Sequence, residues 1–153
     1  METAPPPRQR ASARVGAAAL AAELRVALMK STRRLRAEKS DADLTDAQYS
    51  VLAVLDRLGP TTPGEIAAVE RVQPPSMTRT VAALAELGLV TRTEHPADRR
   101  QVLVTLTEAG AATVRETRRR RDAWLARRLA ALTPAERDVL TRAAEILRRI
   151  ADS

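Results

Sequence analysis

The sequence predicts a mainly α-helical protein that carries one small β-hairpin. Aromatic side chains make up only 1% of the 153 residues and phenylalanine is absent, so the core must be aliphatic. Alanine-rich chains of this kind favour helices, because alanine loses no side-chain entropy there. Apolar residues also recur at helical spacing along most of the chain. The exception is the alternating stretch "QVLVTL", which predicts a strand.

The first part of the chain predicts an arm followed by a helix. Residues 1–11 begin "METAPPPRQR", which has no apolar period, and we expect a disordered, proline-rich arm. Residues 12–40 predict one amphipathic helix, because four leucines keep to a single stripe. These are Leu20, Leu24, Leu28 and Leu35.

Three shorter helices follow, and the first two start with a capping box. Thr45 with Gln48, and Thr62 with Glu65, have the spacing at which two side chains satisfy each other's free backbone N–H groups. The first helix should stop at Gly59, and the second near residue 70. The predicted core stripe of the first helix is Leu52, Leu55 and Leu58.

The third short helix should start at the Pro74–Pro75 pair, since proline is tolerated in a first helical turn. Gly88 should end it. Its predicted apolar stripe is Met77, Val81 and Leu84.

An antiparallel hairpin is predicted next, from residues 89–93 and 101–106. Thr107 should cap a long helix that reaches about residue 130, and "TPAE" at Thr133 should cap the last one. Three helices followed by a hairpin make a winged helix-turn-helix, here at residues 41–107. Residues 12–40 and 108–153 supply helices on either side of it.

Composition limits the function. The 26 Lys and Arg against 19 Asp and Glu give a net charge of +7, which fits a polyanion partner or a bias in composition. With no cysteine and one histidine, disulfides, thiol chemistry and zinc sites are not expected. No cofactor motif or paired catalytic carboxylates are present, so we do not expect an enzyme. No stretch is long enough for a membrane span, and we expect a cytoplasmic protein.

The third short helix is the candidate DNA reader. If its apolar stripe faces the core, Arg79 points directly away, where a guanidinium can grip guanine or a phosphate. Pro75, Ser76 and Thr78 lie around it, and the two hydroxyls can bond phosphates or bases. A plain solvated helix face remains the alternative.

The hairpin loop is the second candidate contact. Arg99 and Arg100 lie at its tip, and arginine is drawn into a narrow, negative minor groove. Adjacent residues of an extended backbone point in different directions, so we expect one arginine to enter the groove. Asp98 should hold the loop by pairing with an arginine, for which Arg92 on the preceding strand is the candidate.

The stretches "PPSMTRTVAALAELGLVTR" and "DRRQVLVTLTEAG", with the spacing between them, resemble the MarR (multiple antibiotic resistance regulator) family of winged-helix transcription factors. The resemblance covers about residues 15–150. It implies a homodimer joined through the outer helices, a wing arginine at Arg100 that enters the minor groove, and an Asp98–Arg92 pair that orients the wing. Ser76, Thr78 and Arg79 match recognition-helix contacts. Gln73 departs from the usual serine cap and could instead reach a base.

The resemblance further implies that a small aromatic or phenolic effector binds between the outer helices and the winged domain. Tyr49, Met29 and Arg33 could line such a pocket, although core or surface roles suit them better, and no motif identifies the site. Arg118 to Arg121 are interpreted as a solvated or intersubunit-paired face, and Trp124 as an interface or core residue.

The function predicted from sequence is therefore a dimeric, sequence-specific regulator that binds double-stranded DNA. The resemblance implies that it is a repressor with a palindromic operator. The alternative is a nonspecific or architectural nucleic-acid binder that relies on charge alone.

Overall fold

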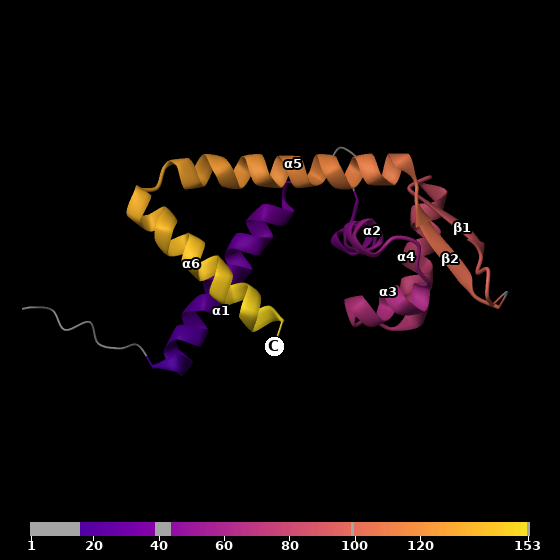
Figure 1. The fold of residues 1–153 in the computed structure, drawn as a ribbon, viewed down its shortest axis with the longest axis horizontal. Helices are drawn as coiled ribbons and strands as arrows, with labels where there is room; N and C mark the ends of the chain where they lie inside the picture. Colours follow the sequence, from indigo (N-terminus) through magenta and orange to yellow (C-terminus); the bar gives the residue numbers. More distant parts are fainter. Residues whose placement is uncertain (1–15, 39–43, 99, 153) are drawn as a thin grey trace, which may run out of the picture. The chain divides into compact units, whose positions relative to one another are not determined.

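A computed structural model describes residues 16–38, 44–98 and 100–152, and it confirms the predicted fold class. The predicted arm at residues 1–11, the start of the first helix and Arg99 lie outside the described residues. The described elements run in the expected order (Figure 1). They are α1 (Ala17–Arg36), α2 (Asp46–Leu58), α3 (Pro63–Glu70), α4 (Pro74–Glu86), β1 (Val90–Glu94), β2 (Val102–Leu106), α5 (Glu108–Ala130) and α6 (Pro134–Ala151).

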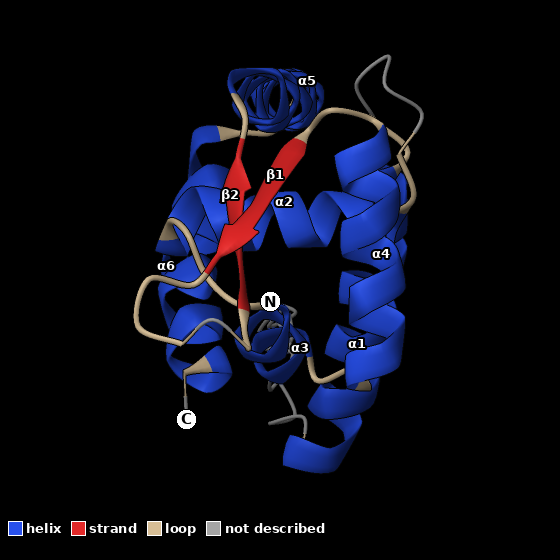
Figure 2. Ribbon diagram, turned by 90° about the vertical axis from the view of Figure 1, so that its right-hand side faces the viewer, coloured by secondary structure: helices blue, strands red, loops and turns tan. Residues whose placement is uncertain are grey.

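The winged domain holds the hydrophobic core of the described chain. Every buried apolar side chain in the described ranges comes from α2, α3, α4, the hairpin, the first half of α5 or the segments that join them. The core forms because the amphipathic faces of these short elements converge, with β1 and β2 beside the helices (Figure 2). Its most deeply buried members are Val51, Leu52, Leu55, Ile66, Val81, Leu84, Val104 and Val114.

The hairpin is antiparallel, as predicted, and its register runs from Val90 opposite Leu106 to Glu94 opposite Val102. The first strand is shifted by one residue at both ends from its predicted bounds, and the second starts one residue later than predicted. A third segment joins the sheet at Thr61, whose N–H donates to the Val104 carbonyl over 3.1 Å and whose carbonyl accepts from Val104 over 2.9 Å. This bridge fixes the hairpin to the start of α3.

The predicted caps are confirmed. Capping boxes join Thr45 to Gln48, Thr62 to Glu65 and Thr133 to Glu136. Thr107 caps α5 by accepting a hydrogen bond from the N–H of Gly110 over 3.1 Å. Gln73 makes no side-chain cap at α4, which agrees with the weak capping ability of glutamine.

Two predictions need correction. Leu58 was expected in the core stripe, but it is 51% exposed, because it is the last residue of α2 and lies beyond the part that the core covers. The first helix was expected to continue to residue 40 but ends at Arg36. There the N–H of Glu38 bonds the Leu35 carbonyl at 3.2 Å, and this i→i−3 turn bond terminates the helix.

The outer helices carry no buried side chain. The chain divides near Arg34 into two units, which we describe separately. On α1 the predicted leucine stripe is exposed, at 46% for Leu20 and 44% for Leu28. On α6 the apolar stripe is also exposed, at 65% for Val139 and 48% for Ile146. Each helix therefore has an apolar face that is not buried among the described residues. None of the helices in the described ranges has the length and apolar content that a bilayer crossing requires.

Candidate nucleic-acid interface

The helix α4 has one buried face and one exposed face. Met77, Val81 and Leu84 are buried, which confirms the predicted inward stripe. Arg79 is exposed on the outward face of the helix. Its neighbours among the predicted contacts are also exposed, namely Gln73, Pro75, Ser76 and Thr78.

The two hydroxyls on α4 differ in what they can still do. The Thr78 hydroxyl donates to the Pro74 carbonyl over 3.1 Å, so its proton is already used within the helix. It can accept a hydrogen bond from a base amino group, but it cannot donate to a phosphate without breaking this bond. No hydrogen bond within the described chain engages the Ser76 hydroxyl, which is therefore the better phosphate donor of the two.

The N-terminal end of α4 and the hairpin tip lie at the same end of the winged domain (Figures 1 and 2). A short turn joins α4 to β1, so β1 runs back along α4 in the opposite direction. The base of this arrangement is fixed by Thr107, whose hydroxyl donates to Gly88 O over 2.8 Å and whose N–H donates to Leu89 O over 3.1 Å. Helix and hairpin can thus meet one DNA surface together.

A carboxylate ties the start of α3 to the hairpin. Glu65 accepts hydrogen bonds from the hydroxyl of Thr61 over 2.7 Å and from the N–H and hydroxyl of Thr62, each over 2.9 Å. These bonds, with that from Thr61 the strongest, lower the pKa of Glu65 to about 2. Because Thr61 also pairs with Val104, it links the start of α3 to β2.

The hairpin tip is shaped by Asp98. Its carboxylate accepts from the backbone N–H of Arg100 and from the side-chain amide of Gln101, each over 3.0 Å, and its carbonyl accepts from Gln101 N over 2.9 Å. The bond from Arg100 N–H, followed by that from Gln101, lowers the pKa of Asp98. The imidazole Nδ1 of His95 accepts from Ala97 N–H over 3.2 Å, so the histidine belongs to the same turn.

The predicted Asp98–Arg92 pair does not form in this structure. Arg92 lies on β1 opposite Val104, is exposed and makes no ion pair within the described chain. The physical reason is local: Asp98 accepts from donors two and three residues away within the turn, which costs less ordering than a bond to Arg92, six residues back on β1. Asp98 therefore shapes the loop through Arg100 and Gln101. Arg100 itself is exposed at the tip, and Arg99 lies outside the described residues.

Two groups of arginines in the winged domain differ in their ion pairing. Those of the first half of α5 are paired within the chain: Arg115 with Glu108 over 2.6 Å, Arg118 with Asp56 over 2.6 Å, and Arg119 and Arg120 with Glu116 over 2.8 and 2.7 Å. Those at the end that carries α4 and the hairpin make no ion pair within the described ranges. These are Arg71, Arg79, Arg92 and Arg100.

The remaining arginines of the run in α5 face neighbours of the same chain. The guanidinium of Arg121 lies 4.2 Å from the ring centre of Tyr49, and that of Arg128 lies 3.6 Å from the ring of Trp124. Tyr49 therefore supports α5 at its contact with α2. Arg118 links α5 to α2 within one chain through Asp56, whereas the sequence suggested a solvated or intersubunit-paired face.

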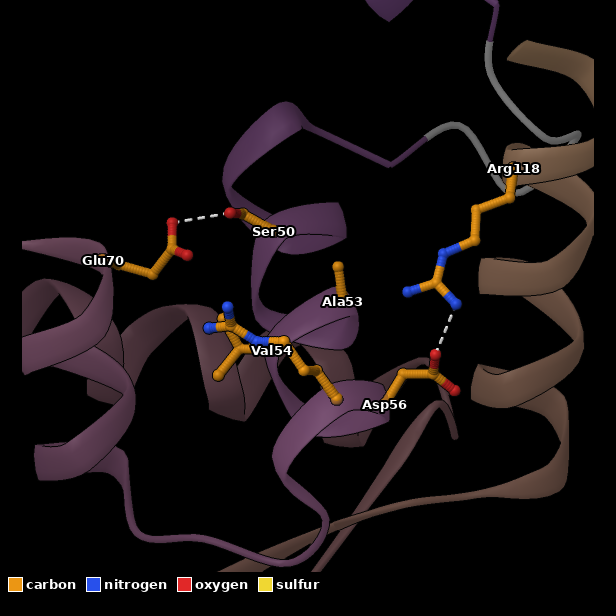
Figure 3. A pocket seen from close by; sticks show the side chains of 7 residues that line it. Ser50, Ala53, Val54, Asp56, Glu70 and Arg118 are labelled. Atoms are coloured by element: carbon orange, nitrogen blue, oxygen red, sulfur yellow. Dashed lines mark hydrogen bonds and ion pairs between the residues drawn. The ribbon is translucent and has the colours of Figure 1, made fainter. Parts of the chain in front are cut away.

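An open pocket of about 530 Å³ lies between α2, α3 and α5 (Figure 3). Two contacts flank it: the Ser50 hydroxyl donates to Glu70 over 2.6 Å on one side, and Arg118 pairs with Asp56 on the other. This pocket was not predictable from the sequence, because Asp56 and Arg118 are 62 positions apart. Within the described ranges, no group of His, Cys, Asp and Glu has the arrangement of a metal site.

The comparisons with known proteins decide the family. A sequence profile of the MarR family matches residues 44–102. An HTH-type transcriptional regulator of Mycobacterium bovis is 46% identical over 135 residues, which cover 88% of this chain and 94% of that relative. The chain belongs to the MarR family.

Solved structures agree with this membership. MarR of Escherichia coli, in its apo form, matches with a TM-score of 0.71 and 30% identity over 84% of this chain and 96% of that one. BpsR of Bordetella bronchiseptica matches with a TM-score of 0.64 and 27% identity over 86% of this chain and 98% of that one. The DNA binding of BpsR is regulated by 6-hydroxynicotinic acid. The predicted winged helix-turn-helix and the class of transcription regulator are thus confirmed.

Proposed function

We propose that this MarR-family protein is a dimeric, sequence-specific repressor that binds a palindromic operator. The observation that carries the proposal is the separation of its arginines. Acids of the same chain neutralise the arginines in the first half of α5, while Arg71, Arg79, Arg92 and Arg100 make no ion pair within the described residues. Unpaired guanidinium groups at one end of the domain match the phosphates and base edges of a duplex.

In the proposed complex α4 lies in the major groove and Arg79 reads a base edge or grips a phosphate. The hairpin follows the duplex to the adjacent minor groove, where Arg100 enters. Gln73, which caps nothing, is free to meet a base at the start of α4. Two copies, joined through the exposed apolar faces of α1 and α6, place two such units on the two halves of a palindrome.

Selection of bound fragments from genomic DNA tests this proposal. We expect recovered sequences to share a palindrome with half-site centres about 10 bp apart. The protein should bind it ~10³-fold or more tightly than random duplex at physiological salt. A reporter placed downstream should be expressed less when the protein is present. Equal affinity for random and selected DNA would instead support the architectural alternative.

Two variants test the assigned contacts. Arg79→Ala should cost about 1–3 kcal/mol of binding free energy and relax the preference at one position of each half-site if Arg79 reads a base. Arg100→Ala should weaken binding mainly where the flanks are A·T-rich, because the narrow groove there attracts arginine. Wild-type affinity in both variants would contradict the assignment of the interface.

We further propose a small aromatic or phenolic acid as effector. BpsR responds to such a ligand, and the pocket between α2, α3 and α5 has a volume that suits a small molecule. A carboxylate bound there would compete with Asp56 for Arg118, and so loosen α2 from α5. The selected operator then provides the assay for candidate acids.

A further inference from the structure

Arg71 has an unusual backbone conformation. It caps the C-terminus of α3 with φ 54° and ψ 41°, and it is the one non-glycine residue of the described ranges with a positive φ. Hydrogen bonds hold it there, since Arg71 N–H donates to the carbonyls of Ala67 and Ala68 and Val72 N–H donates to Ala67 O over 3.0 Å. A left-handed backbone has a steric cost for an L-residue that glycine avoids. The position therefore carries arginine although its backbone conformation favours glycine.

The surroundings leave the charge of Arg71 available. The residue is exposed and has no ion-pair partner within the described chain. The carboxylate of the adjacent acid, Glu70, accepts a hydrogen bond from the Ser50 hydroxyl over 2.6 Å (Figure 3). Glu70 therefore does not neutralise Arg71, although it is its neighbour in sequence.

Arg71 is close in sequence to the first of the proposed DNA contacts, Gln73 at the start of α4. It lies in the turn between α3 and α4, three positions before Pro74 at the start of α4. The start of α4 and the hairpin tip share one end of the domain (Figures 1 and 2). When the first turns of a recognition helix lie at base edges, the residues just before it lie at the rim of the groove, among phosphates.

We propose that Arg71 binds a DNA phosphate at the rim of the major groove, outside both the recognition helix and the wing. This inference rests on the proposed DNA-binding function. A guanidinium can hold two phosphate oxygens, and such a contact adds affinity for any sequence without selecting among bases. The strained turn thus supplies a general anchor beside the specific contacts of α4.

The experiment measures binding to a labelled duplex of mixed sequence, and to the selected operator, between about 50 and 200 mM salt. Three variants are compared with wild type: Arg71→Gly, Arg71→Ala and Arg71→Lys. The matched control is Arg127→Ala, which removes an exposed arginine without an ion pair from the last turn of α5.

Arg71→Gly and Arg71→Ala should weaken binding to both duplexes by similar factors. The slope of log K against log salt is negative, and its magnitude should decrease by about 0.9 for each bound protomer. Arg71→Lys should keep the slope, because it keeps the charge, and so should Arg127→Ala. Arg71→Gly should also melt about 2–4 °C above Arg71→Ala, since only glycine relieves the left-handed backbone. For Arg71→Gly we therefore expect a higher melting temperature than for Arg71→Ala together with weaker DNA binding than the wild type.

A wild-type slope and affinity in Arg71→Gly and Arg71→Ala would overturn the phosphate contact while leaving the proposed function intact. Loss of preference for the selected operator in either variant, with unchanged affinity for mixed sequence, would also overturn it, because it would mean base recognition. Absence of salt-dependent DNA binding by the wild type would overturn the proposed function and this inference together.

Discussion

Asp98 places a negative charge on the surface that we propose faces DNA. If only charge mattered, removing the negative charge of Asp98 would strengthen binding to a polyanion. The structure predicts the opposite for Asp98→Ala, because the carboxylate accepts from Arg100 N–H and from the Gln101 side chain and so sets the hairpin tip. We expect Asp98→Ala to weaken operator binding several-fold, measured by fluorescence anisotropy.

Asp98→Asn separates shape from charge. The asparagine oxygen can still accept from Arg100 N–H, so this variant should bind at least as tightly as the wild type. Tighter binding by Asp98→Ala than by wild type would show that the residue acts only through its charge.

The pH dependence of the turn follows from the ionisation of Asp98. The pKa of Asp98 lies below its ordinary value of 3.8, so the folded turn favours the ionised carboxylate. The resulting stabilisation is fully present above that ordinary value and disappears as the pH falls through the lower folded value. Operator binding near neutral pH should therefore not vary with the titration of this group.

At the scale of elements, Gly110 sets how closely α5 approaches the base of the hairpin. A Cβ built on Gly110 would lie 2.2 Å from the Leu89 carbonyl oxygen and 2.8 Å from Leu106 Cδ1. The oxygen belongs to the backbone and cannot move aside without shifting a whole segment. Gly110→Ala should thus lower the free energy of unfolding by about 1–3 kcal/mol, measured by denaturant titration.

The control for this prediction is a second glycine in the first turn of a helix. A Cβ on Gly64 would meet only Thr62 Oγ1 at 3.9 Å, which is an ordinary contact. Gly64→Ala should leave the stability unchanged or raise it by about 0.5–1 kcal/mol. If both substitutions have the same effect, close packing at Gly110 does not govern the junction of α5 and the wing.

Elements with local signals were predictable from the sequence. Capping boxes such as Thr62 with Glu65 join residues three apart, and the stripe of Met77 and Val81 depends only on helical periodicity, so both could be recognised without the fold. The hairpin was predictable for the same reason, since alternation marks each strand.

Contacts between distant segments were not predictable. The pair of Arg118 with Asp56 and the stacking of Arg121 on Tyr49 depend on how α5 crosses α2, for which neither residue carries a sequence signal. The partners of Asp98 were not predicted either, because Arg92 on the preceding strand was the expected partner, whereas the turn itself offers the nearer donors Arg100 N–H and the Gln101 side chain. The left-handed backbone of Arg71 also had no signal, since glycine is the residue expected at such a cap.

At the scale of the whole molecule, the exposed apolar face of α6 indicates an interface with a partner. Val139, Ala143 and Ile146 follow one stripe at helical spacing, and no residue of α6 is buried. The helix begins with a capping box at Thr133, and this stripe is not buried in it. A second copy of the chain would cover it, and stable dimers bury about 1,600 Å² in total.

Ile146→Asp tests this dimer, because it places a charge in the centre of the stripe. We expect wild type to sediment at twice the chain mass of 16.7 kDa and Ile146→Asp to sediment as a monomer at micromolar concentration. Thr141→Asp introduces the same side chain on the opposite face of α6 and should remain dimeric. A monomer can engage only one half of a palindrome, so Ile146→Asp should also lose about 10²–10⁴-fold in operator affinity. A dimeric Ile146→Asp with wild-type operator affinity would mean that the α6 stripe is not the interface, and a monomeric wild type would contradict the dimer itself.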